Sequence, residues 1–78
     1  MTTIISTLTL GQVVREVRKR QGLRQDELAG AANVGVRFIV DLEGGKPTAQ
    51  LGKALAVMQA LGLRLTLEEP TPSARVQS

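Results

Sequence analysis

The chain contains no cysteine, histidine, tryptophan or tyrosine, and Phe38 is its single aromatic residue. Without cysteine there is no disulfide framework, no thiolate nucleophile and no thiolate metal site. Without histidine, the commonest metal ligand and the usual general base are also missing. The carboxylates are scattered, apart from the neighbours Asp26-Glu27 and Glu68-Glu69. We therefore expect no enzymatic activity, no cofactor and no bound metal.

Long apolar runs are also missing. Residues 1–7 have neither the basic region nor the apolar stretch of a secretory signal, and Lys53 and Arg64 interrupt the apolar region that follows Leu51. We expect a cytoplasmic protein without a membrane partner. A chain of 78 residues predicts one small domain, whose stability would gain from a second subunit.

Positive charge is in modest excess and is unevenly spread. The chain carries ten lysines and arginines against seven acids, a net charge of +3. Between residues 10 and 24, five basic residues stand against Glu16 alone, which leaves a local excess of four charges. The five are Arg15, Arg18, Lys19, Arg20 and Arg24. Such a patch suits a polyanion, although a solvated helix face would have the same composition.

The first helix is predicted to begin at Thr9. Thr9 and Gln12 have the spacing of a capping box, and Leu8 and Val13 are placed as a hydrophobic staple. The buried stripe would follow as Leu10, Val13, Val14 and Val17. We expect the helix to end at Gly22, with Leu23 folding back on it.

Residues 25–43 predict two short helices joined by a tight turn, over about 25–32 and 36–43. Leu28, Ala29 and Ala32 share one face of the first helix, and Ile39 and Leu42 share a face of the second. Asn33 stands between them, and asparagine tolerates the positive φ that a sharp turn needs. The small side chain of Ala29 lets two steeply crossed helices approach closely. This arrangement is typical of a helix-turn-helix.

The rest of the chain predicts a loop, a helical region, a strand and a tail. Residues 44–47 have loop composition, and Thr48 could cap the helical region that follows. Its apolar residues recur at helical spacing as Leu51, Leu55, Met58 and Leu61. After Gly62 the period becomes two, which predicts a strand with Leu63, Leu65 and Leu67 on one face. We divide the chain into a flexible segment (1–8), a DNA-binding and dimerisation domain (9–67) and a disordered tail (68–78).

The segment from Gly11 to Leu67 resembles the Xre/lambda-repressor-like helix-turn-helix family, and within it the small HipB-type antitoxins. The resemblance rests on Arg18, residues 22–25, the apolar frame of 28–43, Glu43, residues 45–47 and the ending 61–67. It implies an all-α, compact five-helix domain with a short C-terminal strand that pairs across a homodimer. Arg24 and Gly35 depart from the family, because they stand where a serine or threonine usually caps a helix. We expect weaker caps there.

The second helix of the motif would read DNA in the major groove. With Ile39 and Leu42 facing inward, the positions on the other side are Val36, Arg37, Val40 and Asp41. Arg37 could grip a guanine edge with two hydrogen bonds, or contact phosphate alone. Asp41 could accept from a cytosine amino group or orient Arg37, while the valines could contact thymine methyl groups. Phe38 could pack against the first helix or lie beside the sugar-phosphate wall, and we favour packing.

Phosphate contacts are expected at the rim of this face. The resemblance places Gln25 at the start of a helix, where its side chain and the helix amides could hold a phosphate. Arg24 and Lys46 are the expected charged anchors. The resemblance also implies that Arg18 and Glu43 form a mostly buried ion pair that fixes the first helix of the domain against the reading helix.

Two functions are predicted, and they are compatible. One is a dimeric repressor that reads a palindromic, double-stranded operator. The other is an antitoxin that neutralises a HipA-like kinase toxin and represses its own operon, which the short chain and its ending favour. A stand-alone Xre-type regulator or a restriction-modification controller is the alternative. Binding to single strands is disfavoured because stacking platforms need aromatic residues.

Overall fold

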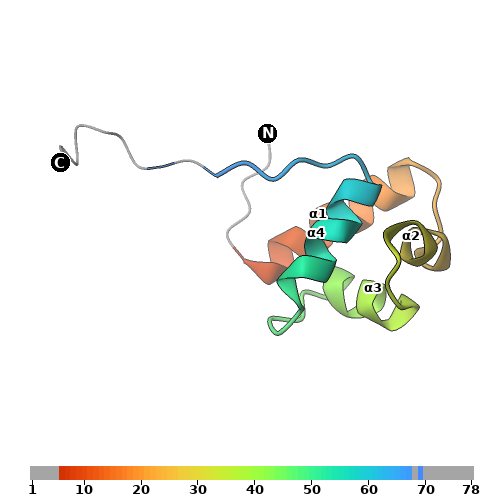
Figure 1. Ribbon diagram of the computed structural model, residues 1–78, viewed down its shortest axis with the longest axis horizontal. Coiled ribbons are helices and arrows are strands. Elements are labelled where there is room, and N and C mark those ends of the chain that lie inside the picture. Colours follow the sequence, from red (N-terminus) through yellow and green to blue (C-terminus); the bar gives the residue numbers. More distant parts are fainter. Residues whose placement is uncertain (1–5, 68, 70–78) are drawn as a thin grey trace.

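The computed structural model describes residues 6–67 and residue 69, and it is all-helical in that part of the chain. Four helices follow one another: α1 (Thr7–Arg20), α2 (Gln25–Ala32), α3 (Val36–Glu43) and α4 (Leu51–Ala60). In Figure 1, α1 and α4 overlap in the view, and α3 lies at one edge of the molecule. Helix α1 packs against α3, and α2 packs against both α3 and α4. The bounds of α2 and α3 confirm the predicted pair of short helices.

The core between the helices is aliphatic, as the shortage of aromatic residues requires. Its fully buried side chains are Leu28, Ile39, Leu42, Val14 and Val57. Each such side chain contributes about 1.5–3 kcal/mol relative to an exposed one. Phe38 is half-buried and packs against this core, which agrees with the packing interpretation.

Helix α1 begins at Thr7, so the prediction of a start at Thr9 was wrong. Ser6 is the N-cap, and its hydroxyl accepts the backbone N–H of Thr9 at 3.1 Å. Ser6 and Thr9 have the same cap-to-N3 spacing as the predicted Thr9 and Gln12, three residues earlier in the chain. Leu8 consequently lies inside the helix and is 55% exposed. The helix thus starts two residues before the predicted position, and residues 1–5 lie outside the described part.

The turns that close α1 and α2 confirm their predicted conformations. Gly22 has φ +74°, and the N–H of Leu23 donates to the carbonyl of Arg18 at 3.1 Å, as in a Schellman closure. Asn33 ends α2 with φ 58° and ψ 46°, the left-handed conformation that asparagine tolerates. The N–H of Val34 then donates to the carbonyl of Ala29 at 3.0 Å. This turn fixes the angle at which α3 leaves α2.

Helices α1 and α3 approach so closely that Gly11 has to be a glycine. A Cβ added to Gly11 would lie 2.8 Å from the carbonyl oxygen of Glu43 and closer still to that of Leu42. At the start of α1, the Thr7 hydroxyl donates to the carbonyl of Gly45 at 2.8 Å. The first helix therefore contacts both the end of α3 and the loop that follows it.

Helix α4 begins later than the sequence suggested. Gln50 is its N-cap and makes no side-chain capping bond, whereas Thr48 lies in the preceding turn, so the prediction that Thr48 caps this helix was wrong. Residues 44–50 thus form a longer loop than the predicted 44–47. After α4, Gly62 adopts φ +77° and the N–H of Leu63 donates to the carbonyl of Met58 at 2.8 Å.

The predictions of five helices and of a C-terminal strand are not met, since residues 6–67 and 69 contain four helices and no strand. Residues 63–67 lack a strand because a β-ladder needs a second strand, and no other segment of the described chain lies in that role. Leu63 packs on the core, but Leu65 is 50% exposed and Leu67 is 88% exposed. The predicted tail, 68–78, lies outside the described residues apart from Glu69.

None of the helices described has the length and apolar character needed to cross a membrane. The same residues contain no grouping of three or more acidic side chains that could hold a metal ion.

Candidate nucleic-acid interface

Helix α3 is strongly two-sided. Ile39 is fully buried and Leu42 is 2% exposed, while Val36 and Val40 are 44% and 43% exposed. The side chain of Arg37 is 86% exposed. All four predicted base-reading positions therefore lie on α3 away from its buried stripe, although Asp41 is only partly exposed.

Asp41 joins two of the cations that we expect to touch DNA. One of its carboxylate oxygens, Oδ1, accepts from Arg37 Nε at 3.3 Å, and the other, Oδ2, accepts from Lys46 Nζ at 3.4 Å. Arg37 lies one helical turn earlier on α3, and Lys46 lies in the loop after the helix. We call these three residues the Asp41 cluster.

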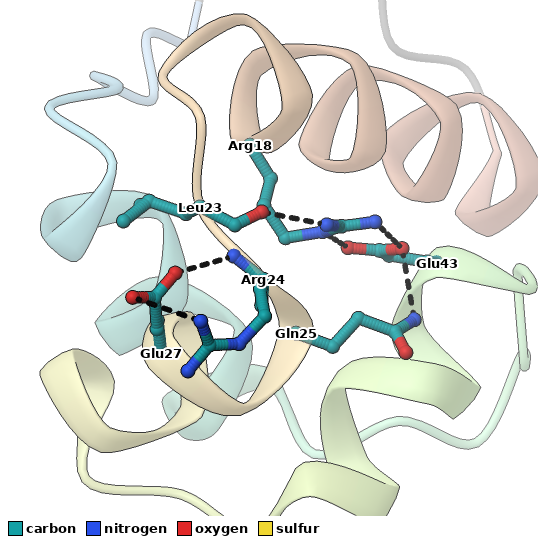
Figure 2. Close-up of polar contacts among 6 residues, drawn as sticks. All are labelled: Arg18, Leu23, Arg24, Gln25, Glu27 and Glu43. Carbon is teal, nitrogen blue, oxygen red and sulfur yellow. Dashed lines mark hydrogen bonds and ion pairs between the residues drawn. The ribbon is translucent and has the colours of Figure 1, made fainter.

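Arg24, the third expected cation, is also paired. Its Nε donates to Asp26 at 3.0 Å, and its Nη1 lies 3.7 Å from Glu27. The hydrogen bond from Arg24 lowers the pKa of Asp26 below its ordinary value. Glu27 Oε1 also accepts the backbone N–H of Arg24 at 2.8 Å (Figure 2). Because an arginine side chain has no acceptor, only this half of a capping box forms, in accord with the expected weaker cap.

The junction between α1 and α3 contains the Arg18–Glu43 ion pair. Arg18 donates from Nε to Glu43 Oε2 at 2.5 Å and from Nη2 to Oε1 at 3.0 Å, and its Nη1 donates to the carbonyl of Leu23 at 2.8 Å (Figure 2). Only 9% of the Arg18 side chain and 5% of the Glu43 side chain are exposed. The hydrogen bond to Glu43 raises the pKa of Arg18, so its charge persists at every accessible pH.

Gln25 stands at the first position of α2 and is anchored to this pair. Its Nε2 donates to Glu43 Oε1 at 3.2 Å (Figure 2). An open hollow beside it is lined by Arg15, Arg18, Gln25, Glu43 and Gly44. Since Arg18 and Glu43 satisfy one another, Arg15 supplies the free positive charge of this hollow.

Two further cations in this region, Arg15 and Lys53, were not predicted individually from the sequence. Arg15 lies three residues before Arg18, a spacing that places both on one helix face and could have identified it. Lys53, on α4, holds its ammonium 5.8 Å from the centre of the Phe38 ring. No local pattern in the sequence indicates the contact between Lys53 and Phe38, because it joins α3 and α4 across the loop 44–50.

Comparison with known proteins agrees with this architecture. The family described as "Helix-turn-helix domain" matches residues 9–70. An uncharacterized HTH-type transcriptional regulator, y4mF, of Sinorhizobium fredii is 64% identical over 61 residues, which are 78% of this chain and 80% of that protein. The immunity repressor protein of Bacillus phage phi105 is 32% identical over 59 residues, 76% of this chain but only 41% of the repressor.

Solved structures of HipB have the same fold. HipB in a HipB–O4 20mer complex and in a HipA–HipB–O2–O3 complex superposes with a TM-score of 0.81 at 26% identity. Each superposition covers 88% of this chain and 97% of the HipB chain. The outward face of α3, the turn at Asn33 and these matches lead to one conclusion: the chain belongs to the Xre-like helix-turn-helix family of transcriptional regulators, with a fold similar to that of HipB antitoxins.

Proposed function

We propose that this protein is a dimeric repressor that binds a palindromic, double-stranded operator in the cytoplasm. The observation that carries the proposal is the two-sided α3, which buries Ile39 and Leu42 and presents Val36, Arg37 and Val40 outward. A recognition helix needs this division, because one face has to be held rigidly while the other enters the major groove.

The proposed contacts separate into base reading and phosphate binding. Arg37 would reach a guanine edge, with Val36, Val40 and Asp41 around it. Arg24, Gln25 and Lys46 would bind phosphates, and Arg15 is added to them because it lines the hollow beside Gln25. Phosphate contacts fix the register of the protein on DNA, whereas the base contacts select the sequence.

A matched pair of variants tests this division. Arg37→Ala should cost about 1–3 kcal/mol on the preferred duplex and relax the preference at one position per half-site. Lys46→Ala should weaken binding to preferred and random duplexes alike and reduce the dependence of affinity on salt. Binding titrations on both duplexes at several salt concentrations would measure this. Equal losses on both duplexes for Arg37→Ala would contradict its base-reading role.

The proposed dimer uses residues 63–67 as an intermolecular strand. Leu65 and Leu67 are exposed in the single chain, and pairing with a second copy would bury them and satisfy the backbone groups of both segments. Two recognition helices would then meet half-sites about one helical turn apart. Leu65→Asp should dissociate the dimer in sedimentation experiments at micromolar concentration, and a variant that remains dimeric would place the interface elsewhere.

We further propose an antitoxin role, in which the protein binds a HipA-like kinase. Its support is the similarity to HipB, which is solved in complex with HipA. The alternative is a stand-alone regulator or a restriction-modification controller, and the likeness to y4mF and to the phage repressor favours a regulator of this kind. Co-expression with the product of the adjacent gene, followed by co-purification, separates the two, because only the antitoxin should retain a kinase-like partner.

A further inference from the structure

Three of the cations that we assign to DNA contact, unlike Arg15, already have a carboxylate partner in the free protein. Arg24 is paired with Asp26 and Glu27, and Arg37 and Lys46 share Asp41. A protein that bound DNA by charge alone would present these cations unpaired, since every carboxylate near the phosphates opposes binding. The carboxylates beside these cations therefore need an explanation other than affinity for DNA.

Asp41 differs from the acids beside Arg24 in its burial and in its two partners. Its side chain is 26% exposed, against 59% for Asp26 and 40% for Glu27. Each of its oxygens holds a different cation, one on α3 and one in the following loop. The carboxylate is thus fixed more firmly than either cation that it holds.

The hydrogen bonds within the Asp41 cluster leave the terminal nitrogens of Arg37 available for contact with a base edge. Asp41 engages Nε of Arg37, and no contact in the described residues occupies Nη1 or Nη2. Those two terminal groups suffice for paired hydrogen bonds to O6 and N7 of a guanine. A guanidinium already held at Nε loses less side-chain entropy on binding than a free one.

We propose that Asp41 is a specificity-determining residue. Its carboxylate holds Arg37 and Lys46 together, and we call this arrangement the clamp. This role rests on the proposed function, and it gives the Asp41 carboxylate two effects. On the preferred site, the clamp orients Arg37 toward the base edge. On random DNA, where no base contact compensates, the negative charge of Asp41 weakens phosphate binding.

Asp41→Asn tests the clamp, since it keeps the shape of the side chain and removes its charge. We expect tighter binding to random duplex, because the negative charge that opposes the phosphates is removed and Lys46 is no longer shared with a carboxylate. The ratio of specific to random affinity should fall about 3- to 10-fold, because Arg37 is no longer held in place. A variant that only loosened the fold would weaken binding to both duplexes.

The control is Glu16→Gln, which removes one negative charge, as Asp41→Asn does, but from the exposed face of α1. It should leave the specificity ratio within about twofold of the wild type, whatever small change it makes to both affinities. A second test introduces Asp41→Asn into Arg37→Ala. If Asp41 acts through Arg37, the double variant should discriminate no worse than Arg37→Ala alone.

The outcomes separate this proposal from the repressor proposal. If the wild-type protein selects no preferred sequence from a randomised duplex library, both fail. If it selects one and Asp41→Asn, with a helical circular dichroism spectrum like the wild type, keeps the full ratio, the clamp alone is wrong. A further loss of discrimination in the double variant would likewise overturn the clamp.

Discussion

Asp41 and Glu43 lie two residues apart on α3, yet their ion pairs lie in contrasting surroundings. Glu43 is 5% exposed and binds Arg18, which is itself 9% exposed. Asp41 is 26% exposed and binds Arg37, whose side chain is 86% exposed. Both pairs join an arginine to a carboxylate, so the difference in burial, and not the residue types, separates their roles. The buried pair can hold two helices together, whereas the exposed pair leaves the terminal nitrogens of Arg37 open to DNA.

The largest expected effect comes from breaking the buried pair. Glu43→Ala would leave Arg18 charged, buried and short of its acceptor, and should lower the free energy of unfolding by about 3–5 kcal/mol. Asp41→Ala is the matched change on the exposed side and should alter stability by no more than about 0.5 kcal/mol. Urea denaturation of both variants would measure this contrast. Similar losses for the two would show that burial does not separate them.

The next effect concerns the close approach of α1 and α3. Gly11→Ala would place a methyl group against the carbonyls of Leu42 and Glu43 and should destabilise the fold by about 1–3 kcal/mol. Gly30→Ala is the control, because nothing lies within 4 Å of a Cβ there, and it should stabilise α2 by about 0.5–1 kcal/mol. If thermal melts gave the two variants the same sign, the tight junction would be refuted.

A smaller effect is expected from the start of α2. Glu27→Ala removes the acceptor of the Arg24 backbone N–H and should cost about 0.5–1.5 kcal/mol. Solvent can replace this acceptor because the Glu27 side chain is 40% exposed, so the loss should fall well below that of Glu43→Ala. Denaturation of the two single variants under one set of conditions would rank them.

The smallest effect is a dependence on pH. The hydrogen bond from Arg24 lowers the pKa of Asp26 in the folded protein. Its stabilising contribution is therefore complete above the pKa of aspartate in the unfolded chain, about 3.9, and is lost as pH falls through the lower folded value. Asp26→Asn should remove that part of the acid dependence, and carboxyl chemical shifts of the wild type would show a midpoint below the ordinary one if the assignment is right.

The sequence was most informative where structure is determined by neighbours along the chain. The spacing of Leu28 to Ala32 and of Ile39 to Leu42 predicted α2 and α3, and Asn33 predicted the turn between them. The same local patterns misplaced the starts of α1 and α4. Ser6 competes with Thr9 as a cap, and Gln50 forms the start of α4 without any side-chain capping bond.

Contacts between distant segments were less accessible to sequence reasoning. The Arg18–Glu43 pair was expected through family resemblance, not from its spacing. The need for Gly11 follows from the path of α3, and the contact of Asp41 with Lys46 follows from the course of the loop after it. The alternation after Gly62 predicted a strand, but residues 63–67 have no pairing partner among the residues that the structure describes.

The hydrogen bond between Thr7 and Gly45 has a mechanical consequence. It joins the start of α1 to the loop that follows α3, while at Gly11 the backbone of α1 packs against the last turn of α3. A displacement of the start of α1 would therefore be transmitted to α3 through these two contacts. A molecule that binds the start of α1 would thus act directly on the position of α3, the helix that we propose enters DNA.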